Sequence, residues 1–146
     1  MPVKIGTSGW QYRHWLGTFY PEGLATGRWL GFYAGRFDTV EVDSAFYRLP
    51  PTDVFARWCE ETPEGYLRFH AGIASPRPCY GRRALSSWAS RIAQTWPEEE
   101  ADVYAYFDND SCTCAPHDAQ RFATACAREG LRTSRVPARG TVTLCE

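Results

Sequence analysis

The sequence lacks long apolar runs and lacks an excess of charge of either sign. No stretch approaches the roughly 20 consecutive apolar residues of a membrane-spanning helix, and no charged segment followed by an apolar one marks the N-terminus as a secretory signal. Sixteen lysines and arginines face 17 aspartates and glutamates, which gives a net charge of −1. This balance argues against strong binding to nucleic-acid backbones and against a membrane partner. We therefore expect a cytoplasmic protein.

Aromatic residues and cysteines, by contrast, are plentiful. The 146 residues suffice for one domain with its own core. Aromatics make up 15% of them, with six tryptophans; large rings fill a core or form the wall of a ligand site. A reducing compartment keeps thiols free. We therefore expect free thiols at all six cysteines, which are Cys59, Cys79, Cys112, Cys114, Cys126 and Cys145.

The apolar periodicity predicts a strand followed by a helix, four times in succession. Such alternation favours an α/β fold with a parallel sheet and helical crossovers. Strands are expected near residues 3–10, 39–43, 66–70 and 101–107, and helices near 26–37, 52–62, 86–96 and 116–128. These elements form one domain over residues 1–130. For the C-terminal tail, residues 131–146, a short strand at 141–144 and disorder both remain open.

The topology also predicts where a site would lie. Right-handed crossovers place the carboxyl ends of all four strands at the same side of the sheet. Glu41 and Asp43 alternate with apolar residues in the second strand, so both side chains share one face. Arg68 and His70 share a face of the third strand in the same way. We expect these groups to meet at one rim.

Five segments of the chain resemble a known family. They read IGTSGWQY at 5–12, WLGTFYP at 15–21, FDTVEVDSAFYRLP at 37–50, RFH at 68–70 and YFDND at 106–110. Together they are similar to the DUF72 (YecE-like) family, over roughly residues 3–128. The resemblance implies a TIM barrel, in a family whose biochemical function is unsettled. Small departures are Asp43 and Asp108, where the family pattern leads us to expect asparagine.

The resemblance also implies that the middle of the barrel is missing. A complete (β/α)8 barrel takes about 250 residues, so roughly 100 are absent. The first two βα units lead, near Gly65–Arg68, directly into segments that resemble the last two. First and last strands are neighbours in a closed barrel, so we expect a partial barrel of four parallel strands in the order 2-1-4-3. Its two open edges favour closure by a homodimer, with an unstable product as the alternative.

We interpret the rim as a site for a small polar or anionic molecule. Glu41 and Asp43 are candidates for an acid/base pair or for cation ligands, with His70 as a third catalytic candidate. Arg68 beside His70 suits an anionic group, and a polar network that only orients loops is the alternative. The other candidate binding residues are Ser8, Trp10, Tyr12, Phe46, Tyr47, Arg48, Asn109 and Asp110.

Three kinds of function fit this rim. An enzyme or degenerate-enzyme site is the first, and a binding or oligomerising module without chemistry is the second. A barrel that binds nucleic acid weakly is the third, and the near-neutral charge counts against it. The run Cys112-x-Cys114-x-x-His117 offers three soft ligands but no fourth, so we interpret its cysteines as incidental and assign no metal or cofactor.

Overall fold

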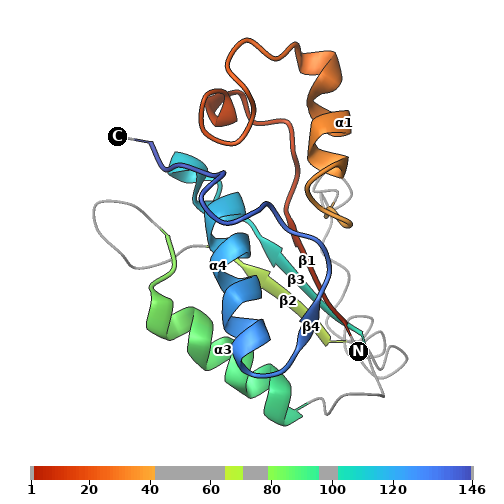
Figure 1. Ribbon diagram of the computed structural model, residues 1–146, viewed down its shortest axis with the longest axis vertical. Helices are drawn as coiled ribbons and strands as arrows, with labels where there is room; N and C mark the ends of the chain where they lie inside the picture. The colour runs from red at the N-terminus through yellow and green to blue at the C-terminus, as the bar shows by residue number, and fades with distance from the viewer. Residues whose placement is uncertain (1, 42–64, 71–78, 96–101, 146) are drawn as a thin grey trace, which may run out of the picture.

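The computed structural model describes residues 2–41, 65–70, 79–95 and 102–145 (Figure 1). They form an α/β unit around one open sheet of four parallel strands: β1 (Pro2–Thr7), β2 (Gly65–Phe69), β3 (Val103–Phe107) and β4 (Arg132–Thr133). The strand order is β2-β3-β1-β4, and each neighbouring pair is parallel. The predicted α/β class with a parallel sheet is therefore confirmed.

Three of the predicted strands have the predicted neighbours. β1 pairs with β3 from Val3↔Val103 to Thr7↔Phe107, and β2 pairs with the other side of β3. Of the strand expected at 39–43, only residues 39–41 are described, and there a parallel bridge joins Ser8 to Glu41 on the side of β1 opposite β3. Residues 42–64, which include the helix expected at 52–62, lie outside the described residues.

The fourth strand of the sheet comes from the C-terminal tail. β4 pairs with the start of β1 through Pro2↔Arg132 and Val3↔Thr133. Ser134 extends this pairing, because its N–H donates to Val3 O and its hydroxyl accepts from the Ile5 N–H at 2.8 Å. The strand considered at 141–144 is not present there. A two-residue strand that is completed by a side chain has no periodicity to detect.

The described α-helices are α1 (Trp29–Ala34), α3 (Arg82–Thr95) and α4 (Cys114–Arg128). Short 3-10 turns precede or connect them: η1 (Arg13–Trp15), η2 (Thr26–Arg28) and η4 (Ser111–Thr113). α3 begins at Arg82, four residues earlier than predicted, so Ser86 lies inside the helix. No described helix is long and apolar enough to cross a bilayer.

The core lies between the sheet and its helices. Figure 1 shows α3 and α4 side by side over one face of the sheet. On this face Phe69 stacks on Phe107 with ring centres 4.6 Å apart, and Phe122 of α4 packs against both rings. The helix predicted near 116–128 buries an apolar stripe, made of Ala119, Phe122, Ala123 and Cys126. Arg68, between the core residues of β2, faces the other side of the sheet and reaches the rim.

Two disulfides correct the prediction of free thiols. Cys79 is bonded to Cys114, and Cys112 is bonded to Cys145. Cys126 is free and buried, and Cys59 lies outside the described residues. The prediction was wrong because it depended on an expected compartment, whereas the fold brings cysteines 33 and 35 residues apart into contact. One bond ties the start of α3 to α4, and the other ties the tail to η4.

Candidate functional site

The candidate site lies where the parallel strands end. Ser8 follows β1, Arg68 and His70 come from the end of β2, and Asp108 follows β3. Glu41 reaches the same place through its bridge to Ser8. The structure therefore brings Ser8, Glu41, Arg68 and His70 to one rim, together with Asp108.

Glu41 is the most enclosed acid of this group, with 6% of its surface exposed. Its N–H donates to Thr7 O at 3.0 Å, and its carbonyl accepts from the Gly9 N–H at 2.9 Å. One carboxylate oxygen, Oε2, accepts from the Ser8 hydroxyl at 2.5 Å and lies 3.4 Å from Arg68 Nε. The other oxygen, Oε1, is buried and has no hydrogen-bond partner within the described ranges.

Two tyrosines hold the segment that leads into Glu41. The Tyr33 hydroxyl donates to Thr39 O at 3.1 Å and accepts from the Thr7 N–H at 3.0 Å. The Tyr106 hydroxyl lies 2.8 Å from the Thr39 hydroxyl. Burial raises the pKa of both tyrosines above the ordinary value, so both hydroxyls keep their protons at neutral pH. The backbone before Glu41 is therefore fixed by neutral groups.

Arg68 lies between two carboxylates. Its Nη2 is 3.1 Å from Asp108 Oδ2 and donates to the Ser8 hydroxyl at 3.3 Å, while its Nε faces Glu41. His70 Nδ1 lies 3.0 Å from the same Asp108 oxygen, although the His70 side chain is 69% exposed. The Arg68 guanidinium therefore pairs with two carboxylates of the protein itself. These carboxylates occupy the place where we expected Arg68 to bind an anionic ligand.

Asp108 lies at the rim, as its place at the end of the fourth predicted strand indicates, but it was not among the candidate binding residues. The resemblance led us to expect asparagine here, and the aspartate was treated as a departure from the pattern. Its carboxylate joins Arg68 to His70. The available signal was its position directly after the strand that ends at Phe107, the same kind of position that selected Ser8.

Asn109 and Asp110 turn to other parts of the molecule. The buried Asn109 amide donates to Asp118 Oδ2 of α4 at 2.8 Å. Asp110 contacts the loop after β1, where its carbonyl lies 2.8 Å from His14 Nε2 and its carboxylate 3.5 Å from the same nitrogen. These contacts anchor the end of β3 to α4 and to η1, and neither joins the Glu41–Arg68 network.

Aromatic residues of the first loop flank the rim. Tyr12 donates its hydroxyl to Ser8 O at 2.5 Å, and its ring lies against Trp15. Gly9 has a φ of +79°, and a Cβ there would lie 2.9 Å from the Tyr12 hydroxyl, so only glycine suits this position. Trp10 is half-buried. The other predicted rim residues, Asp43, Phe46, Tyr47 and Arg48, lie outside the described residues.

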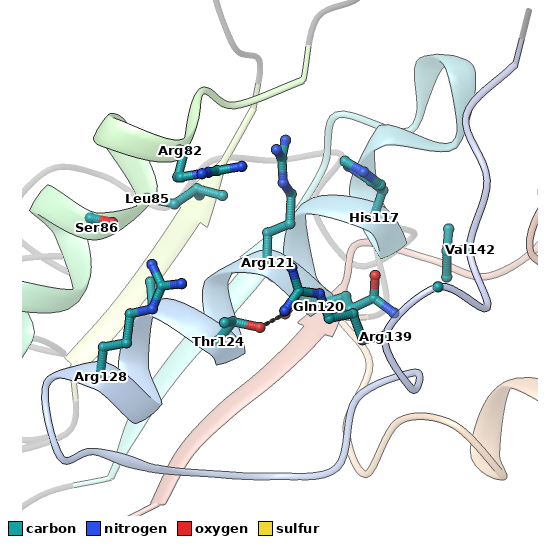
Figure 2. A pocket seen from close by; sticks show the side chains of 12 residues that line it. Arg82, Leu85, Ser86, His117, Gln120, Arg121, Thr124, Arg128, Arg139 and Val142 are labelled. Carbon is teal, nitrogen blue, oxygen red and sulfur yellow. Dashed lines mark hydrogen bonds between the residues drawn. The ribbon is translucent and has the colours of Figure 1, made fainter.

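A cavity lies on the helical side of the molecule (Figure 2). It has a volume of about 300 Å³ between α3, α4 and the tail. None of the described lining residues is acidic, and His117 lies among them. Four of them are arginines: Arg82, Arg121, Arg128 and Arg139. Figure 2 shows Arg82 on α3 and Arg121 on α4, two of the residues that line the cavity. Sequence reasoning missed this cavity, although the spacing of Arg121 and Arg128 places both on one helix face.

Comparison with known proteins identifies relatives but no activity. A family model described as "Protein of unknown function DUF72" matches residues 4–67 and 64–141. The two partial matches meet at 64–67, where we placed the join between the first and last barrel units, and they support an internally shortened member. UPF0759 protein YunF of Bacillus subtilis (strain 168) is 33% identical over 64 residues, which are 44% of this chain and 22% of YunF. The match therefore spans less than a quarter of that relative. No solved structure matches the chain.

Proposed function

The chain belongs to the DUF72 family of proteins of unknown function, and we propose that its rim binds a small polar molecule whose hydroxyl group donates a hydrogen bond to Glu41. The observation that carries this proposal is the buried oxygen Glu41 Oε1, which has no hydrogen-bond partner among the described residues. Buried polar atoms are almost always paired, and leaving one unpaired costs about 1–3 kcal/mol. A ligand hydroxyl would supply the missing donor.

The charges of the rim favour a hydroxylated ligand over an anionic one. Glu41 and Asp108 contribute two carboxylates, and Arg68 is engaged by both. An anion would have to displace a carboxylate from that guanidinium. A sugar-like molecule needs no such exchange, because its hydroxyls can both donate and accept. The half-buried rings of Trp10 and Tyr12 add an apolar surface on which such a ligand could stack.

Binding and acid–base chemistry would use the same atom at this site. A hydroxyl that donates to Glu41 Oε1 lies within reach for proton transfer. The short contact to Ser8 and the neighbouring guanidinium hold the carboxylate in one orientation. Glu41 therefore accepts the hydrogen bond of the ligand hydroxyl. It would also act as the base in any reaction of that bound hydroxyl.

Saturation-transfer NMR with a panel of neutral monosaccharides tests this proposal. We expect signals with the wild-type chain, and a loss of at least tenfold in affinity in Glu41→Gln, because an amide cannot replace both carboxylate contacts. Glu129→Gln changes the same group at the exposed end of α4 and should bind as the wild type does. Equal binding by Glu41→Gln, or no binding of any sugar by the wild type, would contradict it.

A second candidate function belongs to the arginine-lined cavity. Four guanidinium groups without an acidic neighbour in the described lining favour a phosphate-bearing anion, since arginine pairs with phosphate through two parallel hydrogen bonds. Calorimetric titration with pyrophosphate should detect binding that weakens as salt is added. Arg121→Ala should lower the affinity about tenfold, whereas Arg13→Ala, an exposed arginine of η1, should not. Binding that is unchanged in Arg121→Ala would exclude this cavity.

A further inference from the structure

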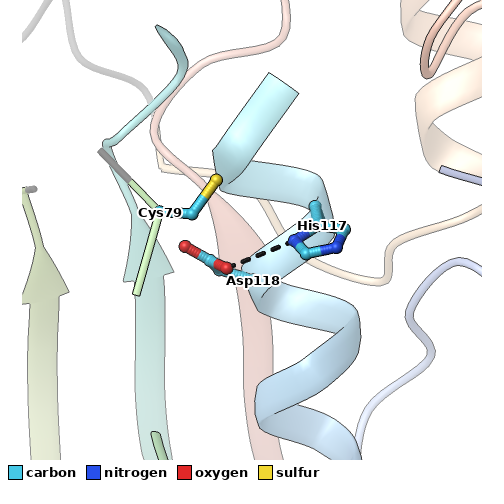
Figure 3. Close-up of side chains that lie close together, drawn as sticks. All are labelled: Cys79, His117 and Asp118. Atoms are coloured by element: carbon cyan, nitrogen blue, oxygen red, sulfur yellow. Dashed lines mark hydrogen bonds and ion pairs between the residues drawn. The ribbon is translucent and has the colours of Figure 1, made fainter. Parts of the chain in front are cut away.

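We propose that reduction of the Cys79–Cys114 disulfide converts its surroundings into a zinc site, completed by His117 and Asp118. One ligand atom each from Cys79, His117 and Asp118 lies within 4.8 Å of the other two (Figure 3). Cys114 is bonded to Cys79, so its sulfur belongs to the same group. Cys114 and His117 are three residues apart in α4, and this spacing places them on one face of the helix. The site takes Cys114 and His117 from the Cys112–His117 run, and its other two ligands are Cys79, which is distant in sequence, and Asp118, which follows His117.

The spacing of His117 and Asp118 is that of two ligands to one metal. Nδ1 of His117 lies 3.4 Å from Oδ1 of Asp118, which is long for a hydrogen bond. Neighbouring nitrogen and oxygen ligands in tetrahedral zinc, each about 2.0–2.1 Å from the metal, lie about 3.3 Å apart. Two sulfurs, an imidazole and a carboxylate are also a ligand set that zinc accepts.

Contacts behind Asp118 hold its carboxylate toward the group. Its other oxygen, Oδ2, accepts from the Tyr80 N–H at 2.6 Å and from the Asn109 amide at 2.8 Å. Such outer contacts commonly fix the orientation of a metal-binding side chain. They leave Oδ1 facing His117, and they give the buried Asn109 a role next to this group.

Burial and charge also favour a cation here. Asp118 is fully buried, and its only ion-pair partner in the described chain is His117. A buried carboxylate needs a compensating charge. Two thiolates, one carboxylate and Zn²⁺ together carry one net negative charge. His117 also lines the arginine cavity, whose guanidinium groups would balance that charge.

The disulfide and the zinc site cannot exist at the same time, because both use the sulfurs of Cys79 and Cys114. A dithiol reductant breaks the Cys79–Cys114 bond and delivers two electrons and two protons, so that two thiols form while the reductant becomes a disulfide. Zn²⁺ then displaces both thiol protons and forms two zinc–sulfur bonds. Either bond type links the segment before α3 to the first turn of α4. The chain would therefore keep this connection under both oxidising and reducing conditions.

Zinc titration of the full-length chain in its two redox states tests the proposal. After reduction with a phosphine, we expect one tightly bound zinc per chain by mass spectrometry of metals, and none in the oxidised chain. Cobalt should give a thiolate charge-transfer band that is weakened in Cys79→Ser and altered in His117→Asn. The matched control is Cys112→Ser/Cys145→Ser, which removes the other disulfide and should still bind zinc.

Two results would overturn the proposal. One is a reduced chain that stays folded by circular dichroism and binds no zinc. The other is zinc binding that survives in Cys79→Ser/Cys114→Ser. His117→Asn is the variant to use if the cysteine variants fail to fold, because the His117 side chain is 18% exposed and its contact to Asp118 is long. That variant should fold like the wild type and bind zinc at least tenfold more weakly, and unchanged binding would also contradict the assignment.

Discussion

The Ser8 hydroxyl donates to Glu41 Oε2 at 2.5 Å and so joins the end of β1 to a segment 33 residues later in the sequence. Both residues are buried. Glu41 is also held through its backbone by Thr7 and Gly9. The side-chain contact therefore decides where the carboxylate points, while the backbone contacts decide where the residue lies.

Replacing Ser8 with alanine should destabilise the fold and release the Glu41 carboxylate. We expect the free energy of unfolding to fall by about 1–3 kcal/mol, because a buried charged acceptor loses its hydroxyl donor. Urea denaturation followed by tryptophan fluorescence measures the change. Ser87→Ala on the exposed side of α3 is the matched control and should stay within about 0.5 kcal/mol of the wild type. A Ser8→Ala chain as stable as the wild type would show that the contact contributes nothing.

Removing the Arg68 guanidinium should cost more than removing an exposed one. Arg68→Met leaves Glu41 and Asp108 without their shared cation, and we expect a loss of about 2–3 kcal/mol in unfolding free energy. Arg135→Met breaks the exposed pair with Asp38 and should cost less than about 1 kcal/mol. Chemical denaturation of both variants compares them directly. Equal losses would contradict the charge network described at the rim.

Acid should weaken the contact between Asp38 and the tail. The Arg135 N–H donates to Asp38 at 2.6 Å, and this bond, together with the Arg135 guanidinium, lowers the pKa of Asp38 below its usual value. A carboxyl whose pKa is lowered by folding stabilises the fold above its unfolded pKa and loses this contribution as pH falls through the folded value. The stability difference between the wild type and Asp38→Asn should therefore be constant above about pH 5 and shrink toward pH 3. Because Asp38 is 39% exposed, we expect a small difference, which thermal melts across this range would detect. A difference that grows on acidification would reverse the sign and refute the prediction.

The described cysteines should resist alkylation in the oxidised native chain. Four are in disulfides, and burial raises the pKa of the free Cys126 thiol to about 12, so almost none is thiolate at neutral pH. In a Cys59→Ser background we expect no maleimide labelling by mass spectrometry until the chain is reduced or unfolded. After reduction, added zinc should protect two thiols if the site proposed around Cys79 forms. Rapid labelling of Cys126 in the native oxidised chain would contradict its burial.

Association through the open sheet is a separate prediction. β2 is the last strand on its side of the sheet among the described residues, and the edge of a parallel sheet favours pairing with a second copy. We expect light scattering to give twice the 16.6 kDa mass of the chain. Dilution should shift the population toward monomer. A wild-type chain that is monomeric and well folded at high concentration would refute the prediction.

The sequence predicted three of the four described strands and their order, β2-β3-β1, because periodicity and topology follow from the fold class. Alternation in 66–70 put Leu67 and Phe69 on the helical face and Arg68 on the other, and the strand order then followed from the barrel resemblance. The meeting of Ser8, Glu41 and Arg68 required only the rule that parallel strands end on one side. These inferences depend on patterns that a fold class imposes on any sequence.

The features that were missed depend on individual contacts. Asp108 differs from the family pattern by one charge, and only its distance to Arg68 reveals its role. The proximity of Cys79 to Cys114 depends on how the chain closes before α3, which spacing does not determine. β4 consists of two residues, and its pairing with β1 is extended by the Ser134 hydroxyl, which accepts a hydrogen bond from the Ile5 N–H. None of these leaves a periodic signal in the sequence.

The pairing of β1 has a consequence for synthesis on the ribosome. The strand at the very start of the chain finds its neighbours 100 residues later, in β3, and 130 residues later, in β4. Until residues 103–107 and 132–133 have been synthesised, β1 cannot form these pairings. The sheet must therefore assemble after residue 133 has been synthesised, and a ribosome that stalls before Val103 would release a chain whose first strand has neither neighbour.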